Sequence, residues 1–139
     1  MLFGRKGADP EFPRGDQGSG SLDDYKFDLM PAKRDTVIRL AGSDPAQDAI
    51  AQAMEGERIE TAIPRRTPED ERTDAEMPVR LFVDGRILGP VGRVPRGLEA
   101  VVNEALARLE IAGRKPRIPV EVVRTKHGLR VDLQMGETR

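Results

Sequence analysis

The chain has 139 residues, of which 34% are charged and 37% hydrophobic, and its formal net charge is -1. This apolar content suffices for one small core and excludes two, and the lack of cysteine excludes disulfides and thiolate metal sites. No apolar run approaches the roughly 18 residues of a membrane span, and no apolar segment follows the basic start, so we expect a cytoplasmic protein with no membrane partner.

The charges are unevenly distributed. Residues 78–139 hold 12 Lys/Arg against 7 Asp/Glu, a net of +5, whereas residues 35–77 hold 5 against 11, a net of -6. The basic region suits a polyanion, or the acidic region of the same chain or of a second copy. Arginine outnumbers lysine 18 to 5, which is typical of a GC-rich bacterial genome or of phosphate and carboxylate binding.

Residues 1–34 are predicted to form a flexible tail. They are rich in glycine and proline, and their apolar residues follow neither a helical nor a strand period. The string ADPEF at 8–12 resembles the translation of adjacent cloning sites, so part of the tail is a candidate for a vector-encoded sequence. Tyr25, Phe27, Leu29 and Met30 form either a docking segment or the lead-in to the first strand.

A strand, a helix and a second strand are predicted next. Residues 36–41 alternate as a strand, and Ser43 and Pro45 are suited to the start of a helix. Small and apolar residues then recur with helical spacing up to Gly56, and residues 58–65 alternate as a second strand. Residues 67–76, which contain five acidic groups, are predicted to be a solvated loop or, alternatively, a contact for a divalent cation or a partner.

The chain is organised around residues 77–113. Residues 79–83 alternate as a strand, Asp84-Gly85 is a strong hairpin signal, and residues 86–91 return as a strand interrupted by Gly89-Pro90 and Gly92. Leu98 to Leu109 has the best amphipathic helical pattern in the chain.

Two more strands close the domain, at residues 118–123 and 129–133, with a turn at 126–128. The sequence therefore predicts an α+β domain over residues 35–135. It would be a strongly bent antiparallel sheet, or a partly open barrel, of about six strands with two helices. Residues 136–139 are predicted to be a C-terminal tail.

The order and spacing of these motifs resemble the HIRAN domain family, over roughly residues 36–135. LFVDGRILGPVGRVPRG at 81–97 is similar to that family's strand, turn and lead-in to the second helix. IRLAGSDPAQDAIAQAM at 38–54 resembles its first strand and helix, and GLRVDLQM at 128–135 resembles its closing strand. The resemblance implies an OB-like accessory module that binds nucleic acid, with single-stranded DNA as the expected partner. Binding members stack bases on aromatic residues near the first strand–helix turn, whereas Ala41 to Pro45 holds no aromatic residue.

Basic and aromatic side chains are the candidate contacts for nucleic acid. Strand alternation predicts that Arg80, Phe82 and Arg130 face away from the core, as a binding platform or as a solvated outer face. Arg93 and Arg96 lie at the start of the second helix, where exposed N–H groups suit phosphate. The complete set of predicted nucleic-acid contacts is Arg80, Phe82, Arg86, Arg93, Arg96, Arg114, Lys115 and Arg130.

No residue set has the spacing of a catalytic site or a cofactor site. His127 lies in a turn with no visible partner for general-base chemistry, and the GPVG at 89–92 lacks the Lys-Ser/Thr of a phosphate loop. We therefore expect a non-enzymatic module of DNA repair or processing that needs no metal or cofactor. The alternative is a protein-interaction or structural subunit of a homo-oligomer or larger assembly with no nucleic-acid role.

Overall fold

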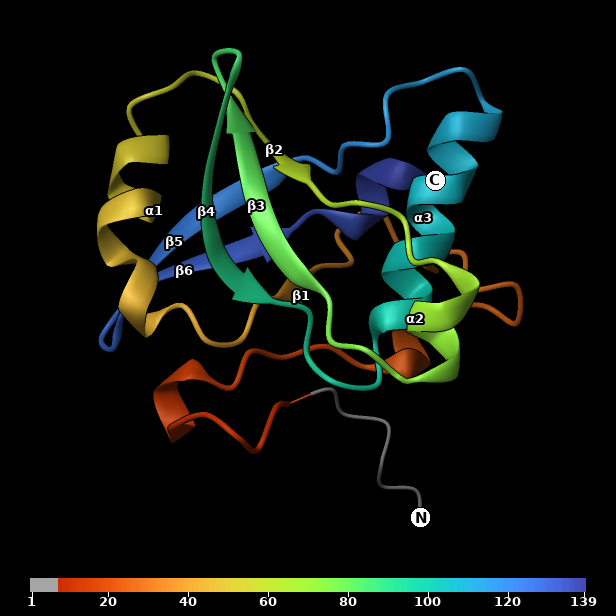
Figure 1. Cartoon of the computed structure of the whole chain (residues 1–139), viewed down its shortest axis with the longest axis horizontal. Helices are drawn as coiled ribbons and strands as arrows, with labels where there is room; N and C mark the ends of the chain where they lie inside the picture. The colour runs from red at the N-terminus through yellow and green to blue at the C-terminus, as the bar shows by residue number, and fades with distance from the viewer. Residues whose placement is uncertain (1–7) are drawn as a thin grey trace.

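The computed structural model describes residues 8–139 and has an α+β fold (Figure 1). Its strands are β1 (Ile38–Arg39), β2 (Ile59–Ala62), β3 (Pro78–Val83), β4 (Arg86–Arg93), β5 (Val120–Thr125) and β6 (Gly128–Leu133). Its α-helices are α1 (Gln47–Ala53), α2 (Pro68–Arg72) and α3 (Glu99–Ile111). Short 3-10 turns include η2 (Arg14–Asp16), η4 (Asp44–Ala46) and η5 (Met135–Thr138). The predicted α+β class is confirmed, with one helix more than predicted.

The six strands form two three-stranded antiparallel sheets, ordered β1-β6-β5 and β2-β3-β4. Figure 1 shows β3 and β4 crossing in front of β5 and β6. Single bridges join the margins of the two sheets, Ala41 to Arg93 at one and Glu60 to Pro119 at the other. The strands of residues 8–139 therefore wrap around one core, but their hydrogen-bond ladder does not close into a barrel.

The core lies between the two sheets and α3. Ile38, Leu81 and Leu133 are fully buried, one from each of β1, β3 and β6. The predicted apolar helical face is confirmed, because Leu98, which precedes α3, and the members within α3 are all buried: Val101, Val102, Ala105, Leu106 and Leu109. Burying a side chain of this size contributes about 1.5–3 kcal/mol, so this face is a major source of stability.

The β3–β4 hairpin turns where the sequence predicts. Asp84 and Gly85 have φ values of 50° and 80°, which is the backbone that a two-residue turn of the favoured hand requires. Phe82 faces Ile87 across the hairpin, and Val83 faces Arg86. This register places Phe82 and Ile87 on one face of the sheet and Val83 on the buried face.

The N-terminal segment differs from the predicted flexible tail. Residues 1–7 lie outside the described residues, but residues 8–34 lie against the domain. Asp9, Asp16 and Tyr25 are buried, and Ser19 pairs with Arg39 at the edge of β1. The segment is anchored by buried carboxylates and by close backbone approach, not by an apolar period. A composition-based prediction therefore missed it.

The predicted C-terminal tail is also packed. η5 follows β6, and Met135, Gly136 and Thr138 are buried. The Gly136 amide donates to the Thr36 carbonyl at 2.9 Å, and Arg108 on α3 donates to the Thr138 hydroxyl at 2.9 Å. The last residues therefore tie α3 to the start of β1.

The acidic stretch at 67–76 is not an irregular loop, since it contains α2. Thr67 and Asp70 form a capping box. The Thr67 hydroxyl accepts from the Asp70 amide, and the Asp70 carboxylate accepts from the Thr67 amide, both at 3.0 Å. Pro68 occupies the first turn, where its missing N–H costs least. The sequence TPED at 67–70 is typical of a helix start, but the many charged residues around it favoured the prediction of a loop.

This capping box gives Asp70 a testable pH dependence. The hydrogen bond from the Thr67 backbone, and then the contact with its hydroxyl, hold the pKa of Asp70 below its ordinary value. Because the folded-state pKa is the lower one, the pairing stabilises α2 above the unfolded-state pKa and is lost as the pH falls through the folded-state pKa. We expect Thr67→Ala to raise the pKa of Asp70 in an NMR titration of its carboxyl carbon.

Thr73→Ala is the matched control for this titration. The Thr73 hydroxyl donates to backbone carbonyls of α2 and not to the Asp70 carboxylate. The control should leave the Asp70 titration in place. An Asp70 pKa that is the same in Thr67→Ala as in the unmodified chain would show that the Thr67 hydroxyl does not help to lower this pKa, because the alanine variant keeps the backbone hydrogen bond to the carboxylate.

Candidate nucleic-acid interface

The outer face of the β2-β3-β4 sheet carries the first candidate site. Arg80 and Phe82 alternate on β3 with the buried Val79, Leu81 and Val83, so they point away from the core as predicted. On β4, Ile87 lies opposite Phe82 and is 61% exposed. The face therefore joins a guanidinium group to a small apolar surface.

Arg117 completes this face from a distant part of the chain. Its guanidinium carbon lies 3.7 Å from the centroid of the Phe82 ring. Glu60 explains the placement, because it pairs with Phe82 on one side and bridges to Pro119 on the other. Arg117, two residues before Pro119, is thereby carried over the ring. The sequence offered no local signal for this contact, since it depends on the junction of the two sheets.

One carboxylate belongs to the same face. Glu60 is the cross-strand neighbour of Phe82, and Arg58 forms an ion pair with it at 3.1 Å. The negative charge of Glu60 is therefore neutralised by Arg58, which lies just before β2. Arg80 and Arg117 have no carboxylate partner among residues 8–139, so the face retains positive charge.

Three other predicted contacts are exposed but lie off this face. Arg86 sits at the hairpin end of β4, opposite the inward-facing Val83. Arg114 and Lys115 are exposed in the connection between α3 and β5, close in sequence to Arg117. A nucleic acid bound on this face could contact each of these three side chains only if it extended past the edge of the sheet.

Arg93 differs from the predicted free phosphate contact. Its side chain is only 12% exposed and it contacts three carboxylates, of Asp9 at 2.7 Å, Glu76 at 2.5 Å and Glu11. Its guanidinium also lies 4.7 Å from the Phe12 ring centroid. Burial opposes its charged form, but the hydrogen bonds to Glu11 and Asp9 outweigh burial and raise its pKa. This arginine holds the N-terminal segment in place.

Arg96 is likewise engaged within the chain. It forms ion pairs with Asp74 at 2.8 Å and with Glu99 at 3.0 Å, and its side chain is 29% exposed. Neither arginine before α3 is therefore free for phosphate in this conformation. The acidic and basic regions meet inside one chain, as the pairs of Arg93 with Glu76 and Arg96 with Asp74 show.

Arg130 is the largest departure from the predicted site, because it is buried rather than surface-exposed. Its side chain is 2% exposed and donates to the Gly15 carbonyl at 3.0 and 2.8 Å and to the Leu129 carbonyl at 2.8 Å. It also pairs with Asp44 at 2.8 Å and lies 3.7 Å from Asp16. The N-terminal segment covers the face of β6 that the alternation assigned to solvent.

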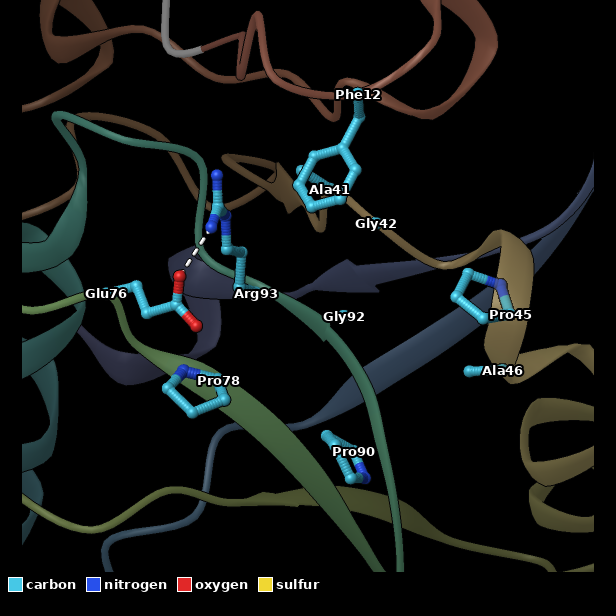
Figure 2. Close-up of a pocket in the computed structure, with 10 residues that line it drawn as sticks. All are labelled: Phe12, Ala41, Gly42, Pro45, Ala46, Glu76, Pro78, Pro90, Gly92 and Arg93. Atoms are coloured by element: carbon cyan, nitrogen blue, oxygen red, sulfur yellow. Dashed lines mark hydrogen bonds and ion pairs between the residues drawn. The ribbon is translucent and has the colours of Figure 1, made fainter.

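A pocket of about 320 Å³ lies between β4, the start of η4 and the N-terminal segment (Figure 2). Its walls are mainly apolar, with Pro45, Pro78 and Pro90 around it and the Phe12 ring at one side. An aromatic residue thus reaches the turn at Gly42 after all, contributed by the segment predicted to be a tail. Arg93 at this pocket is surrounded by three carboxylates, so the pocket does not favour a phosphodiester strand.

Residues 8–139 contain no group of three or more His, Asp or Glu side chains arranged to hold a metal ion. Among the helices of that range, none has the length and apolar character needed to cross a membrane.

Comparisons of the chain with family models, with curated proteins and with solved structures found no match. The similarity to the HIRAN family therefore stands on the motifs of the sequence alone.

Proposed function

We propose that the chain is a non-enzymatic module that binds single-stranded nucleic acid on the outer face of the β2-β3-β4 sheet. The observation that carries the proposal is the stacked pair of Phe82 and Arg117, flanked by Arg80 on the same face. Aromatic rings and guanidinium planes are the groups on which unpaired bases stack. Cations beside them neutralise the phosphates that connect the bases.

The motif resemblance to HIRAN domains supports the same function, with single-stranded DNA as the partner. The proposed site is not the pocket at the turn between β1 and η4. In that pocket the carboxylates of Asp9, Glu11 and Glu76 surround Arg93 and would repel phosphate. A strand would instead lie across β3, with bases against the Arg117–Phe82 stack and phosphates toward Arg80. Arg86, Arg114 and Lys115 would contact the strand beyond the edges of the sheet.

Labelled oligothymidine, titrated by fluorescence anisotropy, tests the proposal. We expect Phe82→Ala to weaken binding by roughly fivefold to a hundredfold, because stacking contributes about 1–3 kcal/mol per base. Binding should also weaken with added salt, with a logarithmic slope of about -0.7 for each phosphate neutralised.

Phe27→Ala is the matched control. Phe27 is a fully exposed aromatic residue in the loop between Tyr25 and Pro31, outside both sheets. Its removal should leave DNA affinity unchanged. Absence of binding at low salt would overturn the proposal in favour of a protein-interaction role, for which the exposed Phe27 ring is the supporting observation. Equal losses of DNA affinity in Phe82→Ala and Phe27→Ala would show that the platform formed by Arg80, Phe82 and Arg117 is not the binding site.

A further inference from the structure

A second basic site lies away from the β2-β3-β4 face, in a cleft of about 650 Å³. One wall is the N-terminal segment from Arg14 to Ser19, and the other is the β5–β6 turn from Thr125 to His127, with Arg39 and Arg130 also lining the cleft. Its volume falls within the roughly 300–1,000 Å³ typical of small-molecule sites. No part of this cleft belongs to the platform around Phe82.

The charges that line the cleft are all positive. Arg14, Arg39, Lys126 and Arg130 contribute to its surface, and none of the described lining residues is acidic. Two of these cations already form ion pairs with carboxylates that do not line the cleft. Arg39 pairs with Asp132 at 2.8 Å, and Arg130 pairs with Asp44 and Asp16. Arg14 and Lys126 have no ion-pair partner within residues 8–139.

The two uncompensated cations stand on opposite walls. Arg14 belongs to η2, and Lys126 belongs to the turn between β5 and β6. The walls touch at one point, where the His127 ring packs so closely on Gly15 that a β-carbon there would lie 2.3 Å from the imidazole. Two like charges held across a cleft are electrostatically unfavourable unless an anion lies between them.

We propose that this cleft binds a phosphate ester of about nucleotide size, bridged between Arg14 and Lys126. Arg14 offers a planar fork that suits phosphate oxygens, and Lys126 offers a mobile point charge. The buried Arg130 and the half-buried Arg39, each paired with carboxylates, make the walls polar. Because the ligand would join the N-terminal segment to the β5–β6 turn, binding should also stabilise the folded chain.

The first experiment titrates pyrophosphate into the full chain at constant ionic strength, followed by amide NMR. We expect saturable shifts confined to residues 14–19 and 125–130. The double variant Arg14→Ser/Lys126→Gln should weaken the apparent affinity by about tenfold, as the loss of two charge-assisted contacts implies. Lys26→Gln/Lys33→Gln removes the same charge from two exposed lysines elsewhere and should change the affinity by less than about twofold.

A second set of ligands identifies the chemical source of the phosphate. Thymidine 5′-monophosphate should bind and thymidine should not. A 5′-phosphorylated oligothymidine that binds the cleft more tightly than the mononucleotide would assign it to a strand end, and equal affinities would assign it to a small phosphate ester. Phe82→Ala should leave pyrophosphate binding intact, so failure of the platform and failure of the cleft are distinguishable.

Three results would overturn the proposal. They are shifts that grow linearly without saturation, shifts centred outside the two walls, and equal pyrophosphate affinity in Arg14→Ser/Lys126→Gln and the unmodified chain. A thermal unfolding scan of each variant without ligand tests whether the fold is retained. Both mutated side chains are exposed, so their loss should shift the unfolding midpoint little.

Discussion

Replacing Arg130 by alanine is expected to lower the free energy of unfolding by about 3–5 kcal/mol, the range observed when one partner of a buried ion pair is removed. The side chain is 2% exposed and Asp16, whose carboxylate it approaches, is 1% exposed. Its loss would also leave the Gly15 carbonyl without its donor, and the Leu129 carbonyl would keep the Gln47 amide at 3.1 Å. Denaturant unfolding should show a lower midpoint with an unchanged slope.

Arg124→Ala is the control for this measurement. Arg124 lies on the same hairpin, is exposed, and has no ion-pair partner within residues 8–139. Its removal should change stability by no more than about 0.5 kcal/mol. If Arg130 stood on a solvated face, as strand alternation predicts, the two variants would behave alike, and that result would contradict the buried placement.

Arg130→Lys separates the charge of this side chain from its shape. Lysine keeps the positive charge, but it cannot reproduce the planar fork that reaches Gly15 and Asp44 from one side chain. We expect a stability between that of the alanine variant and that of the unmodified chain. A lysine variant as stable as the unmodified chain would show that charge alone is needed at this position.

The position of Arg130 also shows what a strand period can and cannot reveal. Alternation correctly predicted that Val131 and Leu133 face the core. It placed Arg130 on the outer face, yet Arg130 is buried, because Gly15 and Asp16 of the N-terminal segment lie against it. That cover is made of glycine, polar groups and backbone. It therefore carries no apolar pattern that sequence reading could detect.

Some contacts of the candidate site could likewise be predicted from the sequence, and others could not. The shared face of Arg80 and Phe82 follows from a period of two along one strand, and it was predictable. The contact of Arg117 with Phe82 joins two sheets, and the carboxylates on Arg93 come from positions 84, 82 and 17 residues away. Local spacing could not show that Arg93 was already occupied. Unequal charge between regions predicted attraction, but not which arginines would remain free.

Removing residues 1–20 is expected to destabilise the domain strongly, although composition alone describes these residues as a flexible tail. The deletion takes away Asp9, which is fully buried beside Arg93, and Asp16, which is buried beside Arg130. It also removes the Ser19 backbone that pairs with Arg39 at 2.9 and 3.1 Å. Losing the partners of the buried Arg130 and the partly buried Arg93 should cost at least about 3 kcal/mol, which corresponds to a fall in Tm of roughly 10 °C for a chain of this size.

The triple variant Asp9→Asn/Glu11→Gln/Asp16→Asn tests whether charge is the cause, because it keeps the segment and removes only its three anchoring carboxylates. Asp24→Asn/Asp35→Asn/Asp48→Asn is its control, with the same change in net charge at three exposed positions. We expect the first variant to reproduce most of the loss in Tm and the second to reproduce little of it.

Hydrogen exchange locates the damage. The amides of Ser43 and Asp44 donate to the Asp16 carboxylate at 2.7 and 2.9 Å, so they should lose protection in both the shortened chain and the triple variant. The amide of Val102, inside α3, donates to Leu98 within the helix and should lose protection only to the extent that global stability falls. An unchanged Tm with unchanged exchange at Ser43 and Asp44 would show that the segment is a tail after all. Selective exposure of those two amides would show that a carboxylate 27 residues earlier in the chain holds the start of η4.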